Sequence, residues 1–420
     1  MTVSSPSEHD DTAVSLRKWV LIGSVAMLFI SGGGMYLIVV ALKDVAMEFG
    51  WPRAVPSFAF SLQFIGSGFG GVLMGQVLDR YGFRVPALIG SVMIGLGAML
   101  VSFIDSAWQL YLIYAVMFGL SGQGSLAAPA MANIARWYDK GRGRAIGIVS
   151  SGQALAGIVW PPIFGLVMAV VGWRDMFFWF GLFALCLMLP LCLLVRHKPP
   201  GFTAQSANAS ARTGSQQRAP ARKQPIPDST IQTRLCCAIF GCCVAMALPL
   251  GHLVAFVTDR GYPIQNGVQV LSVMLMAAFI SRAVLLGVIS DRVGGLKALL
   301  IFSIVQATTL TAFTLVNDLP SLYVVAIIFG LGYGGLFPVY SIVIRDHLPI
   351  GEIGRRTGII FLFGAVAMGF GSWMGGYLFD LTGAYTMPFL IGAGFNLINL
   401  VIVSQLVYRL RDYLPGRSQV

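Results

Sequence analysis

The sequence predicts an all-α membrane protein with twelve transmembrane helices in two pseudo-symmetric halves of six helices each. Hydrophobic residues make up 56% of its 420 residues and charged residues only 11%. A soluble domain could not bury so large an apolar fraction. A helix needs about 20 apolar residues to cross the roughly 30 Å hydrocarbon layer. Twelve runs reach about that length: 19–42, 56–77, 86–104, 108–131, 145–168, 176–195, 235–257, 266–289, 298–316, 322–344, 357–378 and 386–406.

The distribution of charge predicts the orientation of these helices. The net charge is +11, and 23 of the 28 basic residues fall in segments that are cytoplasmic if the N-terminus is inside. The opposite loops hold only Lys43, Arg53, Arg174 and Arg260. Because basic loops stay in the cytoplasm, we expect both termini there. The basic excess then reports topology, and we expect a lipid bilayer and no nucleic acid as partner.

The first run and the cysteines exclude two further interpretations. The run follows Arg17 and Lys18 and lacks a small-residue cleavage site, so it predicts a retained span rather than a signal peptide. All cysteines lie inside apolar runs, and no Cys or His spacing fits a metal site. We therefore expect core cysteines, and neither a metal nor a cofactor.

The chain divides into halves on either side of a polar stretch. Residues 196–234 are rich in Ser, Ala, Gln, Pro and Arg, which is typical of a disordered linker. The predicted parts are a cytoplasmic tail at 1–18, a six-helix half at 19–195, the linker at 196–234, a second half at 235–406 and a tail at 407–420.

One motif occurs in the same loop of both halves. The segment Gly75–Arg84 reads G-x-x-x-D-R-x-G-x-R, and Gly287–Gly294 repeats G-x-x-x-D-R-x-G. The motif resembles the signature loop of the major facilitator superfamily, which implies that fold, a central site at mid-membrane and alternating access. By this resemblance, Asp79 would face Arg355 and Arg356, and Asp291 would face Arg142 and Arg144. The implied cytoplasmic gate comprises Asp79, Arg80, Arg84, Asp291, Arg292, Arg142, Arg144, Arg355 and Arg356; alternatively, these charges only set topology.

Glycine spacing predicts close helix contacts. Small residues four apart let helix backbones approach each other in lipid. Such pairs start at Gly66, Gly71, Gly330 and Gly371. Pro161 and Pro162 predict a bend in the fifth span.

Arg282 is the permanent charge within the twelve runs. It lies nine residues before Asp291, roughly 13 Å into the membrane at 1.5 Å per residue. No Asp or Glu lies in any run, so the counter-ion is expected to come from the substrate, and a carboxylate fits the guanidinium fork. The alternative is that backbone carbonyls or the hydroxyls of Ser281 and Ser290 satisfy this arginine.

His252 is the expected proton carrier. It lies seven residues before Asp259, and its ordinary pKa is near 6.5. It is also a candidate carboxylate ligand, and the alternative is a satisfied contact between helices. Tyr333, Tyr36 and Gln123 are candidates to assist in binding substrate; the alternative, favoured for each residue taken singly, is a hydrogen bond to a neighbouring helix. Other polar residues in the runs are better interpreted as helix contacts: Gln63, Tyr340, Asn396 and Asn399.

Three segments resemble the monocarboxylate transporter family. Arg136–Gly147 is similar to its loop before span 5, Gly251–Gly261 to the end of span 7 in its bacterial members, and Ser281-Arg282 to the span-8 arginine that pairs with the carboxylate. Two of that family's residues are missing: Ala278 stands where animal members carry Asp, and Tyr36 where they carry Lys. The coupling proton would therefore need another carrier.

These features together predict a secondary transporter and not an enzyme. We expect proton-coupled symport of a small monocarboxylate such as lactate or pyruvate, by a functional monomer in a bacterial cytoplasmic membrane. An organic-anion exchanger of the oxalate/formate type and, less favoured, a multidrug exporter are the alternatives. No loop or span offers a nucleophile with a base or a phosphate loop.

Overall fold

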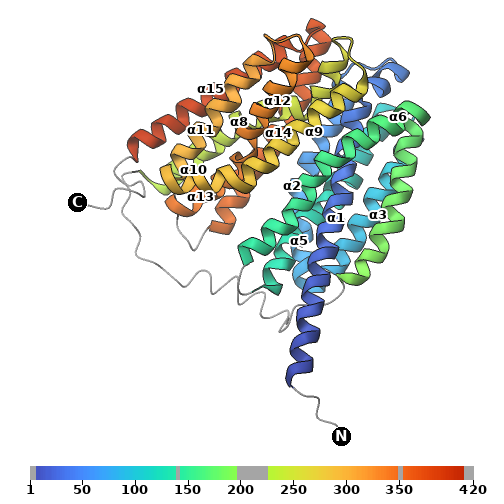
Figure 1. Cartoon of the computed structure of the whole chain (residues 1–420), viewed down its shortest axis with the longest axis vertical. Helices are drawn as coiled ribbons and strands as arrows, with labels where there is room; N and C mark the ends of the chain where they lie inside the picture. The colour runs from blue at the N-terminus through green and yellow to red at the C-terminus, as the bar shows by residue number, and fades with distance from the viewer. Residues whose placement is uncertain (1–5, 139–141, 196–225, 349–352, 411–420) are drawn as a thin grey trace. The chain divides into compact units, whose positions relative to one another are not determined.

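The computed structural model describes residues 6–138, 142–195, 226–348 and 353–410, and these residues are almost entirely helical (Figure 1). The predicted all-α membrane fold is confirmed. Within the described residues, 11 helices are long and apolar enough to span a membrane. One of them, Ala145–Leu194, has 50 residues and is interrupted by Gly172, whose φ is 82°. This helix therefore supplies two of the twelve expected spans.

The described residues form two compact units. Of the described residues, unit 1 comprises 6–37, 66–138, 142–160 and 170–195, and unit 2 comprises 38–65, 161–169, 226–348 and 353–410. The division departs from the expected halves, because unit 2 also holds the end of the first helix and the start of the second. The helices of the first half are α1 (Pro6–Phe49), α2 (Ala54–Tyr81), α3 (Arg84–Val101), α4 (Ala107–Leu112), η1 (Ile113–Gln123), α5 (Gly124–Trp137) and α6 (Arg142–Leu194).

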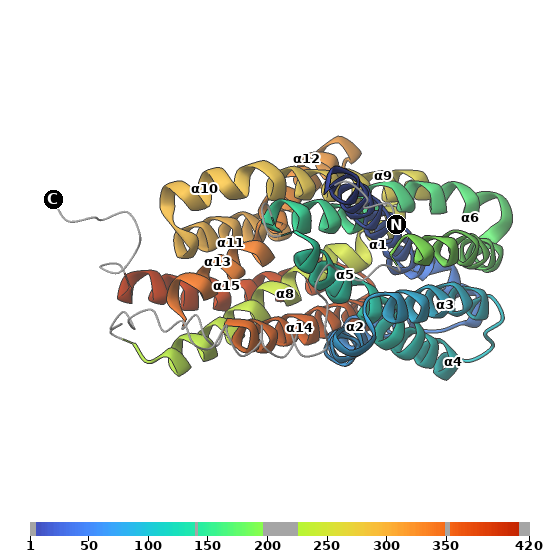
Figure 2. The ribbon, with the colours of Figure 1, turned by 90° about the horizontal axis from the view of Figure 1, so that it is seen from below.

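Unit 2 is built around α8. Its helices from the second half are α8 (Asp228–Thr258), α9 (Ile264–Ile280), η2 (Ser281–Leu285), α10 (Leu286–Val293), α11 (Gly295–Ala312), α12 (Leu319–Gly334), α13 (Leu336–His347), α14 (Ile353–Thr382) and α15 (Thr386–Arg409). α8 packs against α14, α15 and α9, and Figures 1 and 2 both show it beside α14 and α15. In the most apolar 18-residue stretch of α8, 94% of the residues are buried, as expected of a helix that is hydrophobic on all faces.

Two helices extend beyond their expected ends. α8 begins at Asp228, inside the expected linker 196–234, because Pro227 precedes it and an acidic residue in the first turn suits the helix dipole. Residues 196–225 lie outside the described residues. α1 continues to Phe49 since the apolar pattern persists through the buried Val45 and Ala46. Lys43 and Asp44, expected in a loop, therefore lie in a spanning helix.

The glycine pairs differ in how closely they are packed. A Cβ added at Gly66 or Gly70 would meet the backbone of η1, and one added at Gly330 or Gly334 would meet the backbone of α9. By contrast, an added Cβ at Gly75 would meet nothing. A Cβ added at Gly371 would meet the backbone of α8 at Val244, and one at Gly375 would meet the His252 ring. The predicted close contacts thus occur at the first of the two pairs in α2, at the pair in α12 and at the pair in α14. α6 keeps helical torsions through both prolines, and its break lies at Gly172 instead.

A buried polar network joins α11, α13 and α15. Asn396 donates to Gln306 at 2.9 Å, and Asn399 donates to Asn396 at 2.8 Å and to the Ser303 hydroxyl at 2.9 Å. The Tyr340 hydroxyl donates to Asn399 at 3.3 Å. Because these buried groups satisfy one another, the network stabilises helix packing, as the sequence favoured for Tyr340, Asn396 and Asn399.

Candidate functional site

Arg282 lies in η2, a π-helical segment between α9 and α10. Its Nε donates to the backbone carbonyl of Gly334 at 3.2 Å, and the neighbouring Ser281 hydroxyl donates to the carbonyl of Leu331 at 2.6 Å. These bonds hold η2 against α12. In the described part of the chain, no carboxylate pairs with Arg282 and only its Nε is hydrogen-bonded. The two terminal nitrogens can therefore bind a planar anion.

The structure brings Tyr333 to Arg282. Tyr333 directly precedes Gly334 on α12, whose carbonyl accepts the hydrogen bond from Arg282. Its ring stacks on Phe329, with centroids 6.0 Å apart, which fixes its direction. Arg282 and Tyr333 together offer a cation and a hydroxyl donor at one place in unit 2.

Two expected substrate residues belong to unit 1. Tyr36 is buried, and Gln123 donates from Nε2 to the backbone carbonyl of Ser31 at 2.6 Å. The Oε1 atom of Gln123 is buried without a hydrogen-bond partner among the described residues. Gln123 thus joins η1 to α1 and keeps one acceptor unused.

His252 is fully buried in unit 2 and is hydrogen-bonded through both ring nitrogens. Nε2 lies 2.8 Å from the backbone carbonyl of Ser372, and Nδ1 lies 3.2 Å from the hydroxyl of Tyr385. A carbonyl can only accept, so Nε2 carries a proton and, in the neutral ring, Nδ1 accepts from Tyr385. This arrangement assigns the neutral tautomer.

An ion cluster at the predicted external end contains the residues that sequence reasoning missed. Arg53 bonds both carboxylate oxygens of Asp259, with Nη2 2.7 Å from Oδ1, and Lys43 Nζ lies 3.1 Å from the same Oδ1. The Arg53 guanidinium also lies over the ring of Phe379 and donates to Tyr385 at 3.1 Å. The cluster ties the ends of α1 and α2 to α8, α14 and α15 within unit 2.

Asp380 completes this end by capping α2. Its two carboxylate oxygens accept from the backbone N–H groups of Arg53 and Ala54, each at 2.8 Å. α2 begins at Ala54, so a carboxylate from α14 satisfies donors at the N-terminus of another helix. The only signal in the sequence was the presence of Arg53 and Asp259 in loops otherwise poor in charge.

Ionisation in the cluster follows from its contacts. Burial alone would raise the pKa of Asp259, but the hydrogen bonds and charges of Arg53 and Lys43 lower it below its ordinary value. Burial alone would lower the pKa of Arg53, but its bonds to Asp259 and Tyr385 raise it. Burial raises the pKa of Tyr385. The cluster therefore holds an ionised Asp259, a charged Arg53 and a neutral Tyr385.

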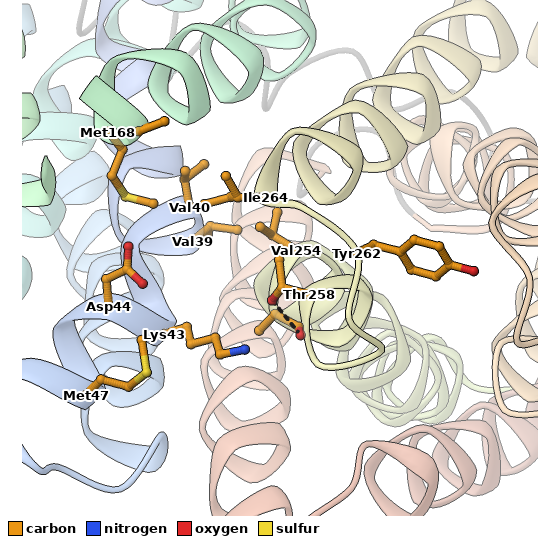
Figure 3. Close-up of a pocket in the computed structure, with 12 residues that line it drawn as sticks. Val39, Val40, Lys43, Asp44, Met47, Met168, Val254, Thr258, Tyr262 and Ile264 are labelled. Atoms are coloured by element: carbon orange, nitrogen blue, oxygen red, sulfur yellow. Dashed lines mark hydrogen bonds between the residues drawn. The ribbon is translucent and has the colours of Figure 1, made fainter. Parts of the chain in front are cut away.

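A cavity of about 340 Å³ adjoins the cluster through Lys43. Figure 3 shows the Lys43 ammonium pointing away from the Asp44 carboxylate and toward α8, while the Tyr262 hydroxyl points away from both. The other lining side chains are mostly apolar: Val39, Val40, Met47, Met168, Ala169, Val254, Ala255, Thr258 and Ile264. The cavity has room for a small organic molecule, since water occupies only about 30 Å³ in the liquid.

The residues of the expected cytoplasmic gate are only partly described. Asp79 forms an ion pair with Arg136, which lies in the same unit. Arg356 donates to Gln232 at 2.7 Å, and Asp291 is exposed. Arg80, Arg84 and Arg292 are exposed, and the side chains of Arg142, Arg144 and Arg355 lie outside the described residues.

Known proteins resemble this chain over most of its length. A sequence model of the Major Facilitator Superfamily matches residues 25–319 and 271–419. Monocarboxylate transporter 13 of Rattus norvegicus is 26% identical over 369 residues, covering 86% of this chain and 80% of the relative. Agnestins efflux protein AgnL12 of Paecilomyces divaricatus is 24% identical over 304 residues, covering 70% and 65%. The solved nucleoside transporter NupG has a TM-score of 0.72 at 11% identity, over 93% of this chain and 99% of that chain.

Proposed function

This chain belongs to the major facilitator superfamily, and we propose that it transports a small organic monocarboxylate together with a proton. That it is a multi-pass membrane transporter follows from the family match and from the spanning helices. The substrate and the coupling are the proposal.

The observation that carries the proposal is Arg282, whose two terminal nitrogens have no protein partner in the described residues. An intramembrane guanidinium without a carboxylate is costly unless an anion from the solvent compensates its charge. A carboxylate can accept two parallel hydrogen bonds from this fork, and Tyr333, next to the Gly334 that Arg282 contacts, is the proposed additional hydroxyl donor. A single fork of this kind suits one carboxylate, which supports a monocarboxylate.

The relatives support the proposal and also name its rival. One similar protein is a monocarboxylate transporter, while another is an efflux protein for agnestins. A charged Arg282 without a described acidic partner favours an anionic substrate over a cationic drug. The exchanger of the oxalate/formate type is the alternative that only transport measurements separate.

His252 is our proposed proton carrier because of how its partners would rearrange. A second proton at Nδ1 would turn this nitrogen into a donor, so that the Tyr385 hydroxyl would have to accept from both His252 and Arg53. Two cations would then share one oxygen. We infer that His252 takes up its proton when Arg53 has left Tyr385, which couples protonation to opening of the predicted external end.

Transport by purified protein in proteoliposomes tests the proposal. Lactate, pyruvate, oxalate, a dicarboxylate and a neutral amide of the same size would each be offered with an imposed proton gradient and, separately, with internal substrate but no gradient. We expect gradient-driven accumulation of the monocarboxylates only. Uptake that requires internal substrate would favour the exchanger, and transport of the amide as fast as of its acid would refute anion selectivity.

A further inference from the structure

The Arg53 guanidinium is held as a rigid carboxylate-binding fork. The ring of Phe379 lies 3.8 Å from its central carbon, and Tyr385 accepts one hydrogen bond at 3.1 Å. These contacts fix the guanidinium plane and leave two N–H groups directed at the two oxygens of Asp259. Two parallel bonds of this kind are the geometry by which arginine recognises any carboxylate.

Asp259 occupies this fork from an unfavourable position. It is the C-cap residue of α8, where the negative end of the helix dipole opposes a carboxylate. Lys43 adds a second cation 3.1 Å from Oδ1, so one carboxylate faces two cations. If Asp259 leaves, the guanidinium fork of Arg53 loses its carboxylate; Asp380 stays bound to backbone N–H groups, and Asp44 remains on the cavity wall beside Lys43.

Room for a free ligand lies next to Lys43. Lys43 lines the cavity of about 340 Å³, whose walls combine aliphatic and methionine side chains with the polar Asp44, Thr258 and Tyr262 (Figure 3). A small organic acid in the cavity could place its carboxylate on Lys43, which lies beside the Arg53–Asp259 pair, and its carbon chain against Val254 and Ile264.

We propose that Arg53 and Lys43 form a carboxylate capture site at the predicted external end, and that the chain's own Asp259 fills it in the structure. The carboxylate of an arriving substrate replaces that of Asp259 when this end opens. Because the substrate carboxylate takes the place of the Asp259 carboxylate, Asp259 can separate from Arg53 and Lys43 while both cations stay paired with a carboxylate. The inference rests on the proposed function only for the class of its ligand.

The test measures acetate binding in variants that carry R282Q, so that Arg282 cannot contribute to the binding. The melting temperature of R282Q, of D259A/R282Q and of R53Q/D259A/R282Q would be measured against acetate, with chloride at equal ionic strength. We expect acetate to stabilise D259A/R282Q with a half-saturating concentration at least tenfold lower than in R282Q, as for a charge-assisted pair. The addition of R53Q should abolish this effect.

A matched control distinguishes acetate binding at the Arg53 fork from a general effect of removing one negative charge. D380N/R282Q removes an acid from the same end without freeing the Arg53 fork. Equal acetate effects in this variant and in D259A/R282Q, or no saturable effect in D259A/R282Q, would overturn the proposal. Should D259A be too unstable to purify, D259N/R282Q keeps the side-chain shape, and equilibrium dialysis with radiolabelled acetate gives the same comparison. If the native protein failed to transport carboxylates, the proposed function would be refuted, but the acetate binding measured in these variants would still support the capture site.

Discussion

The hydroxyl of Tyr385 lies 3.2 Å from Nδ1 of His252. The same oxygen accepts from Arg53 at 3.1 Å, and Arg53 in turn bonds Asp259. The buried imidazole is thus connected through one tyrosine to the ion cluster at the predicted external end. Any movement that separates Arg53 from Tyr385 changes the hydrogen bonding available to His252.

This connection gives the first prediction, for His252→Gln. A glutamine can donate to Ser372 and accept from Tyr385, but it cannot carry a proton. Uptake should therefore lose its pH dependence between about pH 5 and 8, where histidine ordinarily titrates, while substrate binding is retained. Initial rates in proteoliposomes over this pH range measure the effect, and His347→Gln is the matched control. An unchanged profile with accumulation under external acid would show that the proton takes another route.

The second prediction concerns the anion site. Arg282→Lys keeps the positive charge but loses the planar fork, so binding of a monocarboxylate should weaken by about 1.5–3 kcal/mol, or roughly 10- to 150-fold. Isothermal titration of the purified variant measures the affinity. Arg345→Lys, at a side chain that is 69% exposed, should bind normally. Wild-type affinity in Arg282→Lys would mean that the arginine only fastens η2 to α12.

Hydropathy predicted the spans because the length of an apolar run is a local property of the chain. Arg282 could be singled out for the same reason, since a charge within such a run is visible without knowledge of its neighbours. The pairing of Arg53 with Asp259 could not be predicted, because 206 residues separate them and the sequence gives charges but not partners. The sequence does not predict the continuation of α1 past Lys43 either, because a charged pair such as Lys43-Asp44 is typical of the end of a span.

The third prediction uses two glycines of α2 that differ only in packing. Gly70→Ala would push a methyl group into the backbone of Leu120, whereas Gly75→Ala meets no atom. Backbone atoms cannot move aside as a flexible side chain can, so the two helices would have to shift apart. The Gly70→Ala variant should therefore lower the free energy of unfolding by about 1–3 kcal/mol or more. The second should be nearly neutral or slightly stabilising. Melting temperatures in detergent compare the two, and equal values would contradict the packing described for η1.

The fourth prediction concerns the cytoplasmic gate implied by the repeated motif. Asp79→Asn removes the ion pair with Arg136, which is partly exposed and should contribute at most about 1 kcal/mol to stability. If Asp79 and Asp291 hold the cytoplasmic side closed, each Asp→Asn variant should increase the labelling of single cysteines placed at that side in a cysteine-free background. Lost transport with unchanged labelling would indicate a role in folding or topology instead.

The last prediction concerns the stability contributed by Asp259 as a function of pH. Its pKa is lowered from an ordinary value of 3.8, because Arg53 and Lys43 outweigh the effect of burial. A group whose pKa is lower in the folded state stabilises the fold above its ordinary pKa and loses this contribution as pH falls further. Stability due to the ion pair should therefore be constant between about pH 8 and 5, and decline only below about pH 4.

Melting temperatures of the native protein and of Asp259→Asn, measured from pH 8 to pH 3, check this sign. The variant should be less stable at neutral pH by about 1.5–3 kcal/mol, the range for hydrogen bonds to charged groups. The difference should shrink below pH 4, because protonation of Asp259 removes the same interaction from the native protein. Asp105→Asn, at an exposed acid in another loop, should show no such convergence. A difference that disappears already between pH 7 and 5 would mean that Asp259 titrates above its ordinary range, and that Arg53 and Lys43 do not keep it ionised.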